Sequence, residues 1–177
     1  MTGTNTALPI PAPVFILIFF FSTTLFAPFV NSIIAFGEEF GWRGYLLPKL
    51  MPFGKAKAYI IIGLVWGLWH LPLLAVGFNY PGANLFLSIP VFMVLTCMLS
   101  LYINELSLRY RSSIIASWLH GIFNSFSLGV WSILFINVNP ILGGSRGIIG
   151  IAVLSILGVI TLRYFKSKPL INAKKRS

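Results

Sequence analysis

The sequence predicts an all-α protein, a polytopic transmembrane helical bundle of about five spans that forms a single domain over residues 1–177. Two observations support this prediction. The chain is 57% hydrophobic and only 9% charged, with a mean hydropathy of +0.90, whereas about a quarter of the residues of a soluble domain are charged. Its basic residues lie in short segments between apolar runs, as in the loops of membrane proteins. We therefore expect an integral, multi-pass protein of the plasma membrane, surrounded by the lipid bilayer.

A helix needs about 20 apolar residues to cross the hydrocarbon core of a bilayer. Five runs meet this length: about 13–37 (continuing to Leu47), 58–76, 85–104, 113–136 and 148–165. The first run is too long for a cleaved signal peptide and no Lys or Arg precedes it, so we expect a retained span. Pro48 is expected to end that helix, because proline lacks a backbone donor and clashes with the preceding turn.

The basic residues predict which way the helices run. Most of them lie in 48–57, 105–112 and 166–177, whereas 77–84 and 137–147 together hold a single arginine. Since cytoplasmic loops are enriched in Lys and Arg, the N-terminus is expected outside and the basic C-terminal tail in the cytoplasm. The same distribution argues against nucleic-acid binding, because the net charge of +10 does not lie on a soluble basic face.

Polar residues interrupt the apolar spans at three places: Glu38, Glu39 and Arg43, then His70, then His120 and Asn124. An ionisable side chain inside a bilayer costs about 2.5–3.5 kcal/mol on insertion scales and usually faces a cavity or a partner. With a helical rise of about 1.5 Å per residue, all three places lie roughly 12–18 Å from the cytoplasmic edge. This common depth predicts that the polar groups meet in one buried site.

The spacing inside each cluster indicates which side chains project together. Glu39 and Arg43 are four residues apart and can pair on one helix face, whereas Glu38 is turned about 100° away. His120 and Asn124 share a face in the same way. Trp66, one turn before His70, is expected to pack in the core and to wall the site.

Two pairs of glycines also have helical spacing. Gly37 and Gly41, and likewise Gly63 and Gly67, are four residues apart. Such pairs of small residues let membrane helices approach closely. We expect both pairs to bring the helices of the site together.

Taken singly, each cluster has a simpler structural interpretation: a buried ion pair for Glu39, a hydrogen-bonded core histidine for His70, and an interhelical clamp for His120. The third acid of the chain, Glu105, lies next to Arg109 at the end of a span and is expected to form a solvated interfacial pair. The shared depth of the polar groups is the observation that favours a site.

A carboxylate beside a histidine in a dry cavity can take a proton from water, and a histidine with an asparagine can hold a developing oxyanion. These are the parts needed to hydrolyse an amide bond. The HExxH zinc signature is absent from the sequence. Glu38, His70 and His120 would nevertheless supply three N/O ligands to zinc or another divalent metal. The residues alone leave both mechanisms open.

The segments "EEFGWR", "WGLWH" and "HGIFN" resemble the motifs EExxxR, FxxxH and HxxxN of the CPBP family, also called Abi or CAAX-protease-like. The resemblance covers about 36–124. It implies an intramembrane endopeptidase, a group that includes enzymes removing the last three residues of prenylated CaaX proteins. Other members are linked to bacteriocin self-immunity.

The resemblance also implies roles for individual positions: water activation by Glu38 and His70, an oxyanion site formed by His120 and Asn124, and support from Glu39 and Arg43. A metal-independent, glutamate-type enzyme without cofactor is favoured over a metalloprotease, with a membrane-bound or prenylated peptide as substrate. Two features depart from the family pattern. Trp66 replaces the usual Phe, and a single span includes the Glu motif where many members have several before it.

Two other functions are compatible with the sequence. The protein could be a non-catalytic membrane partner, such as an immunity factor, acting through another membrane protein. It could also be a proton-coupled carrier that uses Glu38 and His70 as a relay, although the sequence has no apparent inverted repeat.

Overall fold

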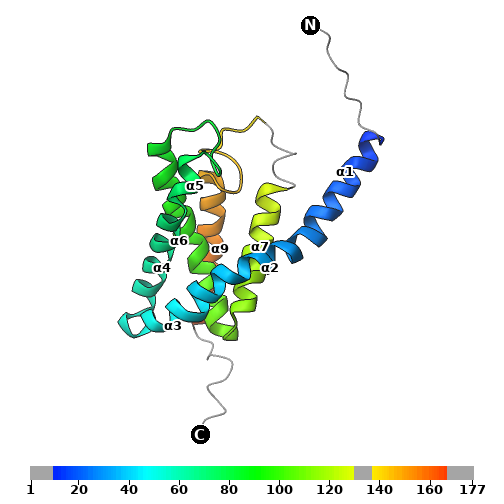
Figure 1. Ribbon diagram of the computed structural model, residues 1–177. Helices are drawn as coiled ribbons and strands as arrows, with labels where there is room; N and C mark the ends of the chain where they lie inside the picture. Colours follow the sequence, from blue (N-terminus) through cyan, green and yellow to red (C-terminus); the bar gives the residue numbers. More distant parts are fainter. Residues whose placement is uncertain (1–9, 130–136, 167–177) are drawn as a thin grey trace.

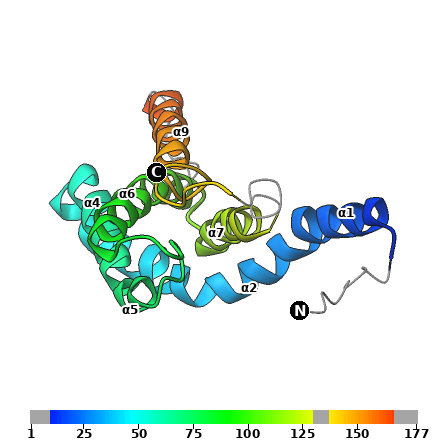
Figure 2. The same cartoon turned by 90° about the horizontal axis from the view of Figure 1, so that it is seen from above.

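The computed structural model describes residues 10–129 and 137–166, and within these ranges all regular secondary structure is helical. The predicted all-α fold is therefore confirmed. Figure 1 shows the arrangement, and Figure 2 gives the view from above. The longer helices are α1 (Ala12–Phe21), α2 (Ala27–Glu39), α4 (Lys55–Trp69), α6 (Leu85–Tyr110), α7 (Ser113–Leu128) and α9 (Ile148–Lys166).

The first helical run, Ala12–Phe53, is 42 residues long, roughly twice what a bilayer requires, and it crosses the molecule obliquely in Figure 1. Two π-helical segments interrupt it, η1 (Ser22–Phe26) and η2 (Phe40–Leu46). Each is followed two residues later by a proline, Pro28 or Pro48. A proline ring clashes with the carbonyl four residues earlier, and a wider π turn at that point lets the helix continue.

The prediction that Pro48 ends the first helix is wrong. Pro48 lies in the first turn of α3 (Leu47–Leu50), where the missing N–H is tolerated. The 3₁₀ turn η3 (Met51–Phe53) extends the run further. It ends at Gly54, whose φ of 105° is a conformation that favours glycine.

The predicted second span is divided at His70. Helix α4 ends there and the short α5 (Leu71–Ala75) follows, because Pro72 cannot donate to the helical ladder. The N–H of His70 instead bonds to the carbonyl of Gly67, three residues back, and tightens the last turn. The histidine is therefore held at a helix end rather than within a continuous span.

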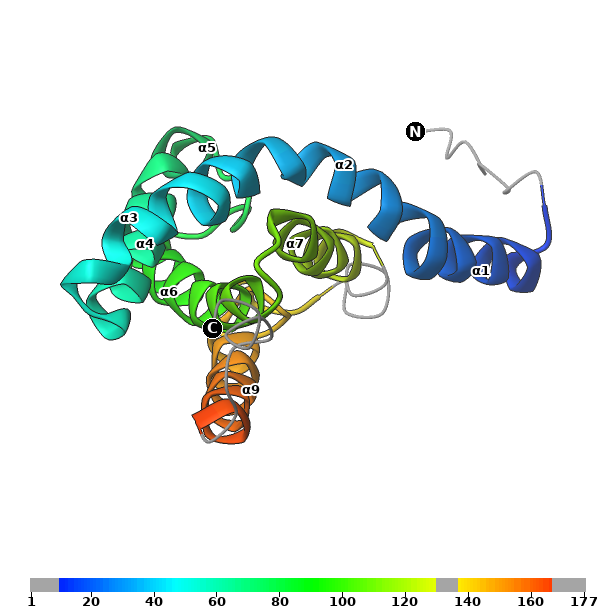
Figure 3. The ribbon, with the colours of Figure 1, turned by 90° about the horizontal axis from the view of Figure 1, so that it is seen from below.

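Helix α7 lies between α2 and α6, as Figure 3 shows from below. It begins after Ser112, whose hydroxyl accepts a hydrogen bond from the N–H of Ile115 as an N-cap. Helix α6 contacts α4 on one side and α9 on the other. Between these helices lies a core that includes Trp66, Phe92 and Leu95.

The glycine pair of α4 packs as predicted. A Cβ placed on Gly63 would lie 2.5 Å from Cys97 Cα, and one on Gly67 would lie 2.6 Å from Met93 Sδ. At Gly63 the close atom belongs to the backbone, so only glycine lets α4 approach α6 this closely. At Gly67 the close atoms belong to the side chains of Met93 and Thr96, which would have to shift.

The prediction for the other pair is wrong, because a Cβ on Gly37 or Gly41 would meet nothing within 4 Å. These glycines face away from the neighbouring helices. The close approach of α2 and α7 occurs instead at Gly121, whose Cβ would lie 2.5 Å from Ser32 N.

Within residues 10–129 and 137–166, three helical runs are long and apolar enough to cross a membrane: Ala12–Phe53, Leu85–Tyr110 and Ile148–Lys166. Helix α4 and the described part of α7, with 15 and 16 residues, are shorter. The last part of the predicted fourth span, 130–136, lies outside the described residues. An all-helical membrane bundle is thus confirmed, whereas the count of five spans stays a prediction.

The basic segments lie at the same end of the bundle. The α3–α4 connection, the α6–α7 connection and the C-terminal end of α9 are all at the lower end in Figure 1. Segments 77–84 and 137–147 lie at the upper end. The fold therefore places the basic connections at one end and the connections with few charges at the other, as the charge pattern predicts. Which end faces the cytoplasm stays a prediction.

Candidate functional site

Glu39 and Arg43 form an ion pair in the interior of the bundle. Arg43 Nη1 lies 2.8 Å from both carboxylate oxygens of Glu39, and the two side chains have no solvent exposure. The four-residue spacing places them together, as predicted from the sequence. Because an unpaired charge at such a position would be strongly destabilising, each residue depends on the other.

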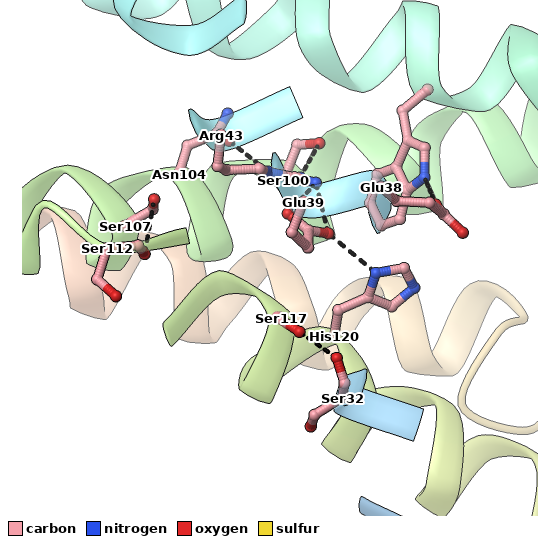
Figure 4. A network of polar contacts seen from close by, with 11 residues as sticks. Ser32, Glu38, Glu39, Arg43, Ser100, Asn104, Ser107, Ser112, Ser117 and His120 are labelled. Carbon is pink, nitrogen blue, oxygen red and sulfur yellow. Dashed lines mark hydrogen bonds and ion pairs between the residues drawn. The ribbon is translucent and has the colours of Figure 1, made fainter. Parts of the chain in front are cut away.

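Two polar residues of α6 complete this cluster. Arg43 Nε donates to Asn104 Oδ1 at 2.8 Å, and Nη2 donates to Ser100 Oγ at 2.9 Å (Figure 4). Neither residue was predicted from the sequence. The sequence does carry a signal for them, since they are polar residues four positions apart within an apolar run. The guanidinium also lies over the ring of Trp66, 4.7 Å from its centre.

His120 joins α7 to this cluster. Its Nδ1 lies 2.9 Å from Glu39 Oε1, and the residue is 4% exposed. An ionised carboxylate only accepts hydrogen bonds, so Nδ1 carries the proton. In the neutral ring Nε2 is then an acceptor, and it becomes a donor only in the imidazolium form. Glu39 thus fixes both the orientation of His120 and the position of its proton.

Glu38 makes a different contact from its neighbour. Trp66 Nε1 donates to Glu38 Oε2 at 3.0 Å, while Glu39 lies toward Arg43 and His120 (Figure 4). Glu38 is half-buried, and no cation lies within ion-pair distance of it among residues 10–129 and 137–166. One oxygen of this carboxylate is therefore available to a water molecule or a substrate. Trp66 is more than a wall, because its indole N–H positions the acid.

His70 is held by its own helix and by aromatic rings. Its Nδ1 lies 2.9 Å from the carbonyl oxygen of Trp66, so this nitrogen donates and Nε2 is an acceptor in the neutral ring. The imidazole packs against Trp69 and Phe92, with centroids 4.9 and 5.1 Å away. These contacts fix the ring while leaving Nε2 for other partners.

A cavity of about 40 Å³ brings three of the four predicted catalytic residues together, since His70, His120 and Asn124 all line it. Arg146 from segment 137–147 also lines it and was not predicted. Glu38 is not in the wall, but its partner Trp66 is. One ordered water needs roughly 10–15 Å³, so the cavity has room for a reacting water beside the histidines.

The candidate metal ligands Glu38, His70 and His120 are not gathered as a three-ligand set in the part of the chain that the structure describes. Within the described residues, no group of three His, Cys, Asp or Glu side chains is arranged to hold a metal ion. Three protein ligands are usual for a catalytic zinc, and Glu38, His70 and His120 do not meet that requirement in this arrangement.

The expectation that Glu105 forms a solvated pair is wrong. Glu105 is 2% exposed and lies beside Lys55 and Arg109 at the basic end of the bundle. It also accepts a hydrogen bond from the Tyr59 hydroxyl at 2.9 Å. Lys55 and Tyr59 come from α4, so the carboxylate joins α6 to α4 and is a structural group outside the site.

Comparison with known proteins identifies the family. Residues 13–126 match the model of the Rce1-like type II CAAX prenyl endopeptidases. A 94-residue segment is 39% identical to CAAX prenyl protease 2 of Methanococcus maripaludis, covering 45% of this chain and 34% of the relative. The chain thus matches about a third of the length of that curated relative. No solved structure matches the chain.

The family match includes the segments of Glu38, His70, His120 and Asn124, and the membrane helices agree with it. The family resemblance inferred from the sequence motifs is confirmed. The chain is an integral membrane protein that belongs to the Rce1-like family of type II CAAX prenyl endopeptidases.

Proposed function

We propose that this protein is an intramembrane endopeptidase that hydrolyses a peptide bond in a membrane-bound or lipid-anchored, CaaX-like substrate. The observation that supports this most is the small cavity lined by His70, His120 and Asn124, beside an acid with no cationic partner among the described residues. Family membership supports the same reaction class.

The reaction begins with water in the cavity. Glu38 and His70 act together as the base, because Glu38 has a free carboxylate oxygen and His70 offers the lone pair of Nε2. The water oxygen attacks the carbonyl carbon, and its proton goes to this pair. Glu38 is outside the cavity wall in the free protein, and we assign its approach to the substrate complex, in which catalytic hydrogen bonds often tighten.

The oxyanion formed by this attack needs donors. Asn124 offers its amide N–H, and His120 offers Nε2–H when it is an imidazolium. When the tetrahedral intermediate collapses, the C–N bond breaks and the base returns its proton to the leaving amine. Glu39 and Arg43 support the step by holding His120 in place. No metal takes part in this mechanism.

Cleavage of a prenylated, membrane-anchored peptide by the purified protein tests the proposal. Glu38→Gln and His70→Ala should each lower kcat at least about a hundredfold, as expected for loss of a general base. Glu105→Gln is a matched control that makes the same chemical change in the structural cluster. Once shown to be folded, the Glu105→Gln variant should retain activity. Retained cleavage in both Glu38→Gln and His70→Ala would reject the assigned roles.

Two further experiments separate this mechanism from a metalloprotease and from a non-catalytic immunity factor. Treatment with a metal chelator should leave cleavage unchanged, and loss of activity that zinc restores would establish a metalloprotease instead. If a folded Glu38→Gln variant leaves the cellular phenotype intact, the protein acts as a non-catalytic immunity factor and the protease proposal is rejected.

A further inference from the structure

Arg146 reaches the cavity from the upper end of the bundle. It lines the cavity together with His70, His120 and Asn124. It is half-buried, and burial lowers the pKa of its guanidinium from the ordinary value. The residue lies just before α9, in segment 137–147, which the sequence predicts to be a connection between spans.

Contacts between two connections fix the position of Arg146. Its Nη1 donates to Asn79 Oδ1 at 2.9 Å, and its backbone carbonyl accepts from the Tyr80 hydroxyl at 2.7 Å. Asn79 and Tyr80 are 8% and 2% exposed. The guanidinium is thus held by a packed framework rather than placed at random by a loose surface loop.

No acidic side chain of the protein pairs with Arg146. The sequence has three acids, all within the described residues. Glu38 bonds to Trp66, Glu39 to Arg43, and Glu105 to Lys55 and Arg109. The positive charge of Arg146 therefore has no anionic side chain as partner, although it lies beside a cavity with aromatic walls. A cation that is partly removed from water is stabilised strongly by a bound anion.

We propose that Arg146 binds a carboxylate of the substrate, namely the α-carboxylate at its C-terminal end. This inference rests on the proposed function. Guanidinium donors match a carboxylate in a planar, two-bond geometry, and among the described residues only Nη1 has a partner. A terminal carboxylate held in this wall directs cleavage to a peptide bond near the chain end, because the same cavity contains the catalytic histidines.

The test uses three membrane-anchored peptides of the same sequence: a free acid, a C-terminal amide, and an amide with an added glutamate near its end. The wild-type protein should cleave the acid at least about tenfold more efficiently than the amide, chiefly through a lower KM, as expected for one charged hydrogen-bond pair. Arg146→Gln should bring the acid-to-amide ratio close to one, and Arg146→Lys should retain part of it. The exposed Arg163 provides the matched control, and Arg163→Gln should keep the full ratio.

The outcomes separate the two proposals. Equal cleavage of acid and amide by the wild type, or an unchanged ratio in Arg146→Gln, overturns the carboxylate site while the protease stands. If the glutamate-bearing amide is cleaved efficiently and this cleavage depends on Arg146, the ligand of Arg146 is an acidic side chain and the assignment of the α-carboxylate is wrong. If no peptide is cleaved, the proposed function fails, and equilibrium binding of acid and amide then decides the site. Asn79→Ala, which keeps the guanidinium, should show a reduced but measurable preference.

Discussion

Trp66 contacts Glu38, Arg43 and both histidines of the site. Its N–H bonds to Glu38, its carbonyl oxygen accepts from His70, and its ring packs 5.0 Å from the ring of His120. The guanidinium of Arg43 lies over the same ring. Since a phenylalanine has no donor on its ring, the tryptophan at this position gives Glu38 a hydrogen bond that the usual family residue would lack.

Trp66→Phe should therefore lower kcat about tenfold with little change in KM, because it removes a hydrogen bond to a charged group. Steady-state kinetics on a prenylated peptide measure this split. The control is Trp118→Phe, at an exposed position of α7, which should leave both constants unchanged. A Trp66→Phe protein that melts at a lower temperature but turns over at the wild-type rate would show that Trp66 is only a packing residue.

At the scale of single elements, small residues decide which helices meet. Helix α4 approaches α6 where Gly63 faces Cys97, and this contact places Trp66 and His70 over α6. Gly41 has the same spacing from its own partner glycine but faces open space. Spacing identifies a pair of small residues, whereas only the packed structure shows whether another helix lies against it.

Gly63→Ala and Gly41→Ala make the same change in these two environments. The methyl group added at Gly63 would collide with the backbone of α6, so the first variant should lose about 1–3 kcal/mol of stability. The second should change stability by less than about 0.5 kcal/mol. Thermal unfolding in detergent measures both. Equal melting temperatures for the two variants would contradict the close α4–α6 contact.

For the whole molecule, the ends of the bundle differ in charge. The basic α3–α4 and α6–α7 connections lie at one end, while segment 137–147, whose Arg146 lines the cavity, lies at the other. If the basic end is cytoplasmic, the upper connections face the outside. The orientation thus decides from which side a substrate terminus reaches the site.

Cysteine labelling tests this orientation. In a Cys97→Ser background, Pro81→Cys should react with a membrane-impermeant maleimide on intact cells, because Pro81 is exposed at the upper end. Lys57→Cys, exposed at the basic end, should react only after permeabilisation. The reverse pattern would overturn the charge rule for this protein and place segments 77–84 and 137–147 on the cytoplasmic side.

Much of the architecture follows from the sequence alone. The apolar composition and the length of the apolar runs predict a membrane protein. Its spans must be helical, because a bilayer offers backbone groups no hydrogen-bond partners outside the helix. Helical spacing also determines that Glu39 pairs with Arg43, since both lie one turn apart on the same helix. The common depth of the polar groups predicted that His70, His120 and Asn124 would meet.

Only the tertiary structure decided which partners those groups have. Ser100 and Asn104 reach Arg43, Glu105 is buried, and Arg146 enters the cavity. Each of these contacts joins residues that are far apart in the chain or depends on how a helix is rotated against its neighbours. Local spacing specifies one face of one helix, whereas the packing of several helices determines which faces oppose each other.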